Sequence, residues 1–435
     1  MTDISRKSLN QWLAKLESLH PTEIELGLDR VSVVYKRLLS HQLAGKVITV
    51  AGTNGKGSTV KLIEAFLLAE GWAVGAYTSP HFLHYNERVV VNGQPVSEGS
   101  LVEAFEQIEV VRGNISLTYF EFGTLAAFYL FAKNNLDVVI LEVGLGGRLD
   151  AVNVAEPDYS VVTSIALDHE DWLGADLEQI GLEKAGIFRP NRPAVCGADV
   201  PASVIDHANE IGASLYQYGS DFIDGLSPAS WSWRGGVKGD HSTELVSLQY
   251  ARLPQNSVNL ALQCCSLLGL KLTTESVNSV IADCKLPGRT QVLSSKPLLV
   301  ADVAHNPQAA SYLATCLKNK SLPGGISFTG KVIAVVGMLT DKDNKGVFQC
   351  LADVIDSWCL AGLSVPRGQT ALSLSAHLER EDIDYQCSDS VADALHQAKL
   401  LAEPEDCVLV FGSFYTVAAL YEALGFQQLE ESLRG

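Results

Sequence analysis

The segment from Val47 to Leu68 constrains this chain more than any other. A β-branched run at Val47–Val50 leads into the turn AGTNGKGST, and Val60, Ile63 and Leu67 then recur at helical spacing. A strand, a glycine-rich loop with a lysine and a helix form an arrangement that binds phosphates, because several backbone N–H groups converge at the start of the helix. The segment therefore predicts a nucleotide site within an α/β fold.

The loop departs from the generic phosphate loop in its spacing. The generic motif has a glycine six residues before its lysine and a hydroxyl residue directly after it. Here Gly52 precedes Lys56 by four residues, and Gly57 follows the lysine. A purely structural glycine-rich turn is the alternative, but it gives no reason for a lysine at this position. The residues expected to contact the nucleotide are Gly52, Thr53, Asn54, Gly55, Lys56, Gly57, Ser58 and Thr59.

Length and charge limit what the chain can be. Its 435 residues exceed the usual size of one domain, so two domains are expected. The 50 acidic and 32 basic residues give a net charge of -18, which disfavours nucleic acids and anionic membranes as partners. The cysteines form no CxxC pair, the N-terminus has no secretory apolar core, and residues 122–132 are too short to span a membrane. We therefore expect a cytoplasmic, monomeric protein that holds anionic small molecules by local positive charge.

Four apolar strands are predicted early in the chain, at Val47–Val50, Val74–Tyr77, Asp137–Val143 and Ser160–Ile165. Helical stretches separate them, which is typical of a parallel sheet flanked by helices. Ligands of such folds bind at the carboxyl ends of the strands. The segments that follow the strands, AGTNGKGST, TSPHF, EVGLGGRLD and ALDHEDWLG, are rich in polar residues and are expected to meet at that edge.

The pattern changes between residues 217 and 249, where short antiparallel strands are predicted, and again after the turn at Leu286–Val292. Strand-like runs at Leu298–Val303, Lys331–Gly337 and Cys407–Gly412 then indicate a second α/β domain. We predict an α/β fold in two parts. Residues 1–288 form a phosphate-loop ATPase domain with a mostly parallel sheet and a small β-rich appendage, and residues 289–435 form a smaller Rossmann-like domain.

A divalent metal site is predicted at the same edge. Glu142 ends an apolar strand, where a carboxylate costs on the order of several kcal/mol unless a charge compensates it. Nucleotide chemistry requires Mg²⁺, which prefers oxygen ligands. Ser79 ends the preceding strand, and His169 lies in ALDHEDWLG. Taken singly, Ser79 suits a local turn and His169 a surface histidine, but their joint placement favours a shared metal.

Other segments have both a chemical and a plain structural interpretation. The glycines of GLGGR do not fit a dinucleotide loop, and a turn at the end of the strand explains them better. Lys184 lies on a predicted helix, where a solvated lysine is the simpler interpretation. Asp302, His305 and Asn306 follow a strand of the second domain and, with Arg289, form half of a candidate site, although Asn306 also suits a helix cap.

Taken in order, the motifs resemble those of the folylpolyglutamate synthase/dihydrofolate synthase family of Mur-ligase-like ATP-dependent amide ligases. The matching segments are GTNGKGST, TSPHF with NER, EVGLGGRLDAVN, the DH of ALDHEDWLG, EKAGIF, LPGR and AHNP, with GMLTDKD and FGSFYTVA towards the C-terminus. Each motif is modestly specific, whereas the ordered set is strongly so. The glycine after Lys56 is this family's own variant of the loop.

The resemblance implies roles for individual residues. Lys56 and the loop would hold the β- and γ-phosphates of ATP, and Mg²⁺, in one or two sites, would be bound by Ser79, Glu142 and His169. Lys184 matches a lysine that the family carbamylates, which replaces the interpretation as a solvated lysine. The implied catalytic residues are Lys56, Lys184 and His305, the further nucleotide contacts are Asn259, Arg289 and Asp302, and the substrate-side residues are Asp29, Arg30, Phe120, Phe122, Asp150 and His305. For Phe120 and Phe122, core packing is an equally good explanation.

The implied reaction joins L-glutamate to a pterin-linked carboxylate through an acyl phosphate, with ATP converted to ADP and phosphate. The acceptor would be dihydropteroate, tetrahydrofolate species or both, and the segments DVAHNP and LTYFEFGTLAA favour the bifunctional bacterial type. The alternative enzymes are a monofunctional folylpolyglutamate synthase, another Mur-type ligase and a phosphate-loop small-molecule kinase. A nucleotide-binding switch is the alternative that is not an enzyme.

Overall fold

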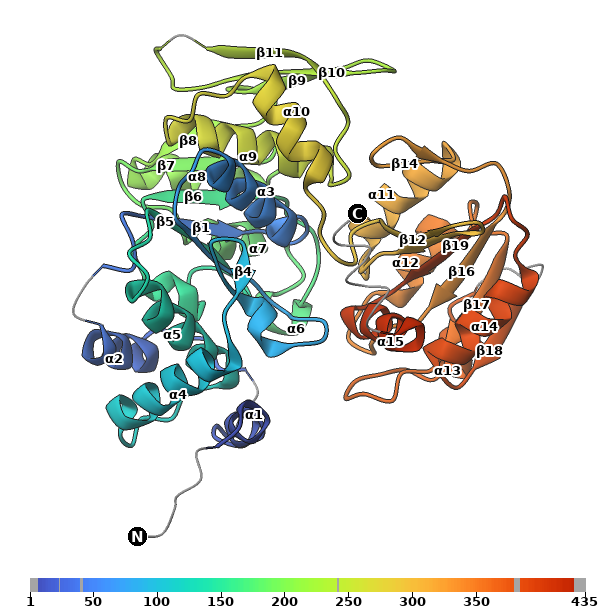
Figure 1. Cartoon of the computed structure of the whole chain (residues 1–435), viewed down its shortest axis with the longest axis horizontal. Helices are drawn as coiled ribbons and strands as arrows, with labels where there is room; N and C mark the ends of the chain where they lie inside the picture. The colour runs from blue at the N-terminus through green and yellow to red at the C-terminus, as the bar shows by residue number, and fades with distance from the viewer. Residues whose placement is uncertain (1–6, 23, 40–41, 241, 379–383, 426–435) are drawn as a thin grey trace. The chain divides into compact units, whose positions relative to one another are not determined.

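The computed structural model describes residues 7–22, 24–39, 42–240, 242–378 and 384–425. They form two compact units, each with its own principal sheet (Figure 1). Within the described ranges, the first unit comprises residues 1–165, 173–248 and 256–280, and the second comprises residues 166–172, 249–255 and 281–435. The second unit thus includes two short segments that precede residue 281 in the chain.

The sheet of the first unit contains β1 (Lys46–Ala51), β2 (Val74–Tyr77), β3 (Val89–Val91), β4 (Gln94–Pro95), β5 (Val138–Glu142), β6 (Tyr159–Val162), β7 (Pro193–Cys196) and β8 (Ser214–Gln217). Their order is β4-β3-β2-β5-β1-β6-β7-β8, and all neighbours pair in parallel except β2 with β3 and β3 with β4. Val50 of β1 lies opposite Glu142 on one side and Val161 on the other. The loops after β1, β5 and β6 therefore leave the sheet at one edge, as predicted.

Helices surround this sheet (Figure 1). α3 (Lys56–Ala69) and α5 (Tyr119–Ala132) are largely buried, because apolar residues occupy much of their surfaces. Further helical elements of the unit are α1 (Leu9–Glu17), α2 (Asp29–Leu38), η1 (Tyr85–Arg88), α4 (Glu98–Arg112), η2 (Ala151–Val154), α7 (Leu177–Ala185) and α8 (Ala202–Ile211), and the short α6 (Glu170–Leu173) includes residues assigned to each unit. Burial of α5 among α1, α2 and α4 makes it the centre of a large aromatic and aliphatic core.

The predicted β-rich appendage is confirmed. It is an antiparallel sheet of β9 (Ile223–Leu226), β10 (Trp231–Gly235) and β11 (Thr243–Leu248), followed by α9 (Gln255–Leu267) and α10 (Thr274–Asp283). Trp231 and Trp233 of β10 are each 1% exposed, so one face of this small sheet is buried. Gln263 of α9 accepts from the Gly236 N–H at 3.0 Å and donates to its carbonyl at 2.9 Å, which fixes the sheet to the helix.

The second unit contains a six-stranded sheet, as expected for a Rossmann-like domain. Its strands are β12 (Gln291–Ser295), β13 (Leu298–Ala301), β16 (Val332–Val336), β17 (Ser357–Ala361), β18 (Tyr385–Ser388) and β19 (Cys407–Phe411), in the order β12-β13-β19-β16-β17-β18. Only β12 pairs antiparallel with its neighbour. The helices are α11 (Pro307–Lys318), α12 (Asn344–Leu351), α13 (Ala371–Ser375), α14 (Val391–Leu401) and α15 (Phe414–Leu424), and β14 (Ser321–Leu322) with β15 (Ile326–Ser327) forms a hairpin.

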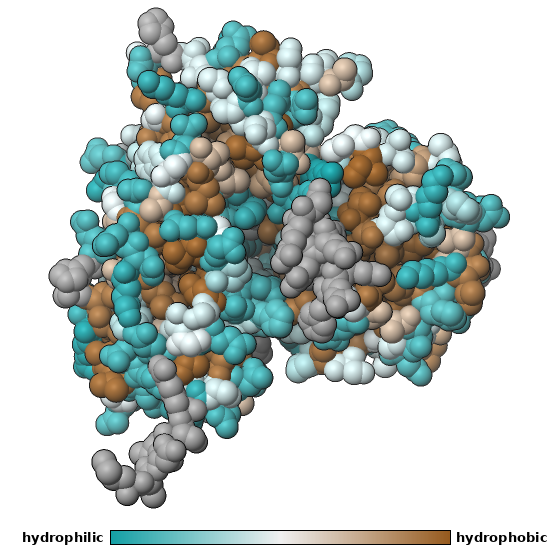
Figure 2. Space-filling view, viewed as in Figure 1, coloured by the Kyte–Doolittle hydropathy of each residue, from teal (hydrophilic) through white to brown (hydrophobic). Residues whose placement is uncertain are grey.

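The surface mixes polar and apolar side chains. On the face shown in Figure 2, hydrophilic residues interrupt the apolar patches. Among the helices that the structure describes, none is long and apolar enough to cross a bilayer.

A packing prediction follows for the central sheet. A Cβ on Gly75 of β2 would lie 2.7 Å from Leu136 and 2.8 Å from Phe131, so Gly75→Ala should lower the free energy of unfolding by about 1–3 kcal/mol. Gly99→Ala on α4 is the matched control, because the nearest atom, the Ser97 hydroxyl oxygen, would be 3.8 Å away. Urea denaturation of the two variants checks this. Equal midpoints would contradict the packing around Gly75.

Candidate active site

The loop between β1 and α3 has the form of a phosphate site. Gly55 caps α3 with a φ of +88°, and Gly52 has a φ of +143°, both in the region that favours glycine. Lys56 is the first residue of α3, and its Nζ donates to the carbonyl oxygens of Gly52 at 3.1 Å and of Thr53 at 3.2 Å. The lysine charge therefore lies over the loop, where the helix N-terminus adds further positive potential.

Residues directly after β6 hold the loop in place. Thr163 donates from its N–H to Ala51 at 2.9 Å and from its hydroxyl to the Asn54 carbonyl at 2.7 Å. The Ser164 carbonyl accepts from the Thr53 N–H at 2.6 Å, and its hydroxyl accepts from the Asn54 N–H at 3.2 Å. A Cβ on Gly52 would overlap the Thr163 hydroxyl, so the close approach of the two segments requires glycine.

Two hydroxyls at the start of α3 fit a phosphate-bound metal. Ser58 and Thr59 are 0% exposed, and neither hydroxyl oxygen has a hydrogen-bond partner among the described residues. Buried polar groups without partners cost free energy, so such groups at a binding loop indicate an absent ligand. Hydroxyl oxygens beside a lysine suit Mg²⁺ and the phosphates it accompanies.

Two of the three predicted metal ligands lie together. Glu142, 5% exposed at the end of β5, accepts a hydrogen bond from the Ser79 N–H at 3.1 Å. His169 has a φ of +54° and lies in the segment 166–172, which groups with the second unit. No group of three or more His, Cys, Asp or Glu side chains arranged for a metal occurs in the part of the chain that the structure describes. The predicted ligand Ser79 is a serine, so the predicted set contains only two side chains of those four types, Glu142 and His169.

Asp150 organises the glycine-rich turn after β5. Its carboxylate, 3% exposed, accepts hydrogen bonds from the N–H groups of Gly144 at 3.0 Å, Leu145 at 2.9 Å and Val152 at 3.0 Å. Burial raises the pKa of Asp150 to about 6, although these bonds and the charge of Lys56 oppose the increase. The GLGG segment is therefore a turn at the end of the strand, as predicted, and the structure assigns Asp150 a role in shaping it.

The predicted substrate-side residues have different environments. Asp29 is exposed at the start of α2, and the neighbouring Arg30 pairs with Glu25 and, at 3.1 Å, with Glu121. Phe120 is half-buried and stands against Gly144, where a Cβ would be 2.6 Å from its ring.

For Phe122, the structure favours the core-packing interpretation over contact with substrate. It is 0% exposed and packs edge-on against Phe105 at 5.6 Å in the core. The reason is helical geometry, because residues two apart on α5 point in nearly opposite directions.

The loop after β2 contains a second positively charged group. Arg88, the last residue of η1, is 9% exposed, and its Nε donates to Nδ1 of His81 at 2.9 Å. Its guanidinium lies over the rings of Tyr85 at 5.2 Å and Tyr119 at 5.7 Å. Burial, followed by the charge of Arg88, lowers the pKa of His81 to about 4, so the imidazole is neutral at pH 7 and accepts this bond.

Lys184 and Asn259 are both buried. Lys184 on α7 is 5% exposed, so the simple interpretation as a solvated lysine is wrong. Asn259 on α9 is 0% exposed and donates to Asp224 of β9 at 2.8 Å, which links the helix to the small antiparallel sheet. Asp224 also accepts from the Tyr218 hydroxyl at 2.6 Å.

In the second unit, Asp302 and Arg289 lie near each other at the end of β13. Asp302 is 8% exposed and accepts hydrogen bonds from the Thr290 N–H at 2.7 Å and the Ala304 N–H at 2.8 Å. Burial raises its pKa, and the charge of Arg289 offsets part of the increase. The guanidinium of Arg289 lies 5.2 Å from the ring of Phe414. Asn306 caps α11 through a bond to the Ala309 N–H, so the structural interpretation of Asn306 is also correct.

Asp168 joins several polar residues of the second unit. Its carboxylate accepts from Lys342 Nζ at 2.6 Å, and it lies 3.3 Å from His305 Nε2 and 3.4 Å from Asn306 Nδ2. Burial alone would raise the pKa of Asp168, but the hydrogen bond and charge of His305, with His169 and Lys342, hold it well below its usual range. His305 Nδ1 also faces the Val303 carbonyl at 2.7 Å. Both ring nitrogens thus face oxygen acceptors, which hold the imidazole in place.

The sequence analysis assigned no role to Asp168, Lys342 or Thr163. Each lies within or beside a segment that follows a strand, and Asp168 and Lys342 also lie in the matching segments ALDHEDWLG and GMLTDKD.

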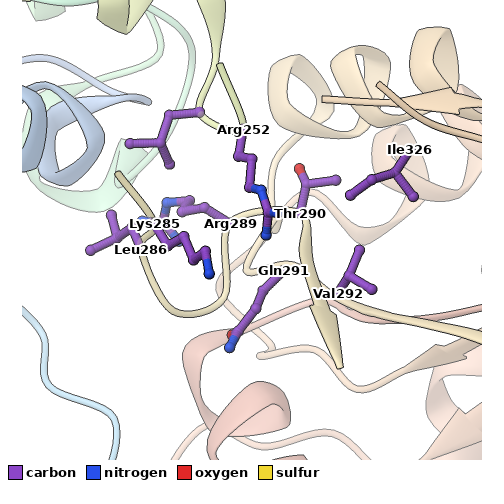
Figure 3. A pocket seen from close by; sticks show the side chains of 9 residues that line it. Arg252, Lys285, Leu286, Arg289, Thr290, Gln291, Val292 and Ile326 are labelled. Atoms are coloured by element: carbon purple, nitrogen blue, oxygen red, sulfur yellow. The ribbon is translucent and has the colours of Figure 1, made fainter. Parts of the chain in front are cut away.

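A basic hollow occurs beside Arg289 (Figure 3). Arg252, Lys285 and Arg289 line it together with Thr290, Gln291 and apolar side chains. It supplies local positive charge in an acidic chain.

Comparison with known proteins identifies relatives across nearly the whole chain. The Mur ligase middle domain matches residues 50–256, and the Mur ligase glutamate ligase domain matches residues 288–414. The dihydrofolate synthase/folylpolyglutamate synthase of Escherichia coli (strain K12) is 47% identical over 96% of this chain and 95% of its own.

Solved structures agree with this match. E. coli FolC in complex with DHPP and ADP has a TM-score of 0.90 at 45% identity, covering 97% of this chain and 99% of that chain. The bifunctional folylpolyglutamate synthase/dihydrofolate synthase of Yersinia pestis, complexed with AMPPNP and Mn ion, has a TM-score of 0.88 at 46% identity, covering 98% of this chain and 100% of that chain.

Gly52→Ala should weaken ADP binding by about tenfold or more, equivalent to about 1.4 kcal/mol, because the added Cβ displaces the loop from Thr163. Gly71→Ala is the matched control, since Gly71 also has a positive φ of +80° but a Cβ there meets nothing within 4 Å. Isothermal titration calorimetry with ADP and Mg²⁺ measures both variants. An unchanged dissociation constant for Gly52→Ala would show that the loop tolerates this displacement.

The raised pKa of Asp150 leads us to expect a specific pH dependence of the free energy of unfolding. A carboxyl group whose pKa is raised from 3.8 unfolded to about 6 folded stabilises the fold below pH 4, and that contribution is lost as the pH rises through about 6. The wild-type protein should therefore lose stability relative to Asp150→Asn between about pH 4 and pH 6. Urea denaturation of both proteins at several pH values gives the difference in unfolding free energy. A difference that is independent of pH would contradict the raised pKa.

Proposed function

This chain belongs to the dihydrofolate synthase/folylpolyglutamate synthase family of Mur ligases, and from that premise we propose the reaction and the role of each site residue. It is an ATP-dependent, amide-forming ligase. It joins L-glutamate to the carboxylate of dihydropteroate and to the glutamate tail of folates, and it releases ADP and phosphate. The relatives complexed with ADP, DHPP, AMPPNP and Mn support these ligand classes.

One observation carries the assignment of the ATP site. In the loop after β1, Lys56 lies across the backbone, and the buried hydroxyls of Ser58 and Thr59 have no hydrogen-bond partner among the described residues. The neighbouring strand β5 ends at Glu142. Lys56 and the N–H groups at the start of α3 hold the β- and γ-phosphates. Ser79, Glu142 and His169 hold Mg²⁺, which screens phosphate charge when bound.

The chemistry requires two anions to approach each other. A carboxylate is a poor acyl donor, so it first attacks the γ-phosphate, and the resulting acyl phosphate then reacts with the neutral amine of glutamate. Lys56 and the helix N-terminus reduce the repulsion and stabilise charge on the transferring phosphoryl group. These residues act by electrostatics and positioning, and no covalent enzyme intermediate is required.

The second unit contributes polar contacts to nucleotide and glutamate. Arg289 and Asp302 of the second unit, and Asn259 of the first, are the nucleotide contacts that the family resemblance implies. Val303 and Asp168 hold the His305 ring in place, so we assign it the role of orienting a substrate group. Lys342, bound to the same carboxylate, fixes Asp168.

Lys184 is a candidate for carbamylation. Lys184 is buried on α7 and matches the lysine that the family carbamylates, and its carbamate would be an anion able to assist a nearby metal. Mass spectrometry of the intact protein in bicarbonate would test for the added mass.

We place the domain boundary near residue 288 and the enzyme in the cytoplasm. Use of ATP, and nine cysteines of which none forms a disulfide in the described chain, support a reducing compartment.

The proposed function is tested by ADP release from the purified protein with ATP, Mg²⁺ and L-glutamate, with dihydropteroate or tetrahydrofolate supplied in turn. Release should depend strictly on both glutamate and the pterin compound, with either acceptor. Phosphate transfer to the pterin compound without incorporation of glutamate would instead indicate a kinase.

Lys56→Ala should abolish turnover, reducing it by about 100-fold or more, because it removes a charge that acts on the transferring phosphoryl group. Lys61→Ala on the same helix is the control, since Lys61 is partly exposed and pairs with Glu64 at 2.9 Å. Steady-state assays with saturating substrates give kcat for both. Activity retained in Lys56→Ala would remove the loop lysine from the mechanism.

A further inference from the structure

Arg88 is a buried cation in the loop that follows β2. It is 9% exposed, and its Nε donates to Nδ1 of His81 while its guanidinium faces two tyrosine rings. No carboxylate pairs with it among the residues that the structure describes. The adjacent Glu87 is already bonded to the N–H groups of a neighbouring turn, at 2.8 Å to Phe82, 2.9 Å to Leu83 and 2.6 Å to His84.

This arrangement differs from that of other arginines in the unit. Arg112 is similarly protected, with a side chain that is 12% exposed, but it makes a bidentate pair with Glu109 at 2.8 Å. A buried charge is normally paired, because its desolvation is otherwise uncompensated. Cation–π contacts supply only part of that compensation. Arg88 therefore has the environment of a residue whose partner is an anionic ligand.

The position of Arg88 indicates which ligand. Its carbonyl accepts from the Thr78 N–H at 2.9 Å, next to Ser79, whose own N–H donates to Glu142. Its charge also acts on Tyr77 at the end of β2. The guanidinium is thus anchored to the loop that follows β2, at the edge of the sheet where the predicted metal ligands Ser79 and Glu142 lie.

The aromatic surroundings favour a planar ligand. Tyr119, under the guanidinium, begins α5 and precedes the half-buried Phe120, whose ring is 6.0 Å from that of Tyr77. Aromatic walls with one buried cation suit an aromatic carboxylic acid better than an aliphatic amino acid. The phosphates of ATP already have Lys56 and the loop N–H groups, so a different anion is required for Arg88.

We propose that Arg88 binds the carboxylate of the pterin-bearing substrate and positions it for attack on the γ-phosphate. The inference rests on the proposed function and adds to it the residue that holds the reacting group. Arginine suits this role because its planar guanidinium donates two parallel hydrogen bonds to a carboxylate. Its positive charge also reduces the repulsion between the carboxylate and the phosphate.

The test compares the binding of an acid with that of its neutral ester. Pteroate and pteroate methyl ester are titrated into the wild-type protein and into Arg88→Met with ADP and Mg²⁺ present, and binding is followed by tryptophan fluorescence. Wild type should bind the acid about 10- to 100-fold more tightly than the ester, as expected for a charge-assisted hydrogen bond. Arg88→Met should bind both ligands equally, at the affinity of wild type for the ester.

Controls separate binding from folding. Arg112→Met should keep the wild-type preference for the acid, because Arg112 already pairs with Glu109. ADP affinity and the thermal midpoint report whether Arg88→Met is folded. If Arg88→Met is not folded, Arg88→Gln replaces it, because glutamine keeps hydrogen-bond donors but not the charge. The ratio of affinities for acid and ester should then fall by about tenfold or more relative to wild type.

Kinetics give a second readout. Arg88→Met or Arg88→Gln should raise KM for dihydropteroate and leave KM for L-glutamate unchanged. A folded variant that still prefers the acid over the ester, or that raises KM for glutamate alone, would overturn the role of Arg88. If wild type neither binds pteroate nor releases ADP with a pterin compound, the proposed function fails instead.

Discussion

The burial of β1 between β5 and β6 is the constraint on which the candidate site depends. A strand paired on both edges must leave the sheet at the point that its neighbours set, and Val50 lies opposite Glu142 and Val161. The phosphate loop therefore begins beside a buried carboxylate and beside Thr163, which bonds to it. Contact with Thr163 determines the shape of the loop as much as its glycines do. Thr163 approaches so closely that only glycine fits at position 52.

Buried charge shows where ligands belong. Asp302 lies in the field of Arg289, Asp168 pairs with Lys342, and Asp150 accepts three backbone N–H groups. Each of these carboxylates has partners within the protein. Arg88 pairs with no carboxylate of the described chain, and among the same residues the hydroxyls of Ser58 and Thr59 have no hydrogen-bond partner. Buried polar groups of this second kind mark positions where a ligand can supply the missing partner.

Much of the fold was predictable because it depends on local pattern. Long apolar runs such as Asp137–Val143 are what a strand covered on both faces requires, and they form β5 and its neighbours. Short strands such as β7 and β18 were not predicted, because β7 (PAVC) begins at a proline and β18 (YQCS) is largely polar. At the site, the family resemblance left Phe122 open between substrate contact and core packing, and helical geometry directs it into the core.

The sequence by itself determined the loop chemistry, the order of the motifs and hence the family, because these depend on residue types at fixed spacing along the chain. Only the tertiary structure decided which polar residues are buried and which of them have hydrogen-bond or ion-pair partners. It showed that Lys184 is buried, that His305 is held at both ring nitrogens, and that Arg88 has no acidic partner among the described residues. The physical reason is that desolvation and pairing are set by neighbours distant in sequence, which the fold brings together around each charge.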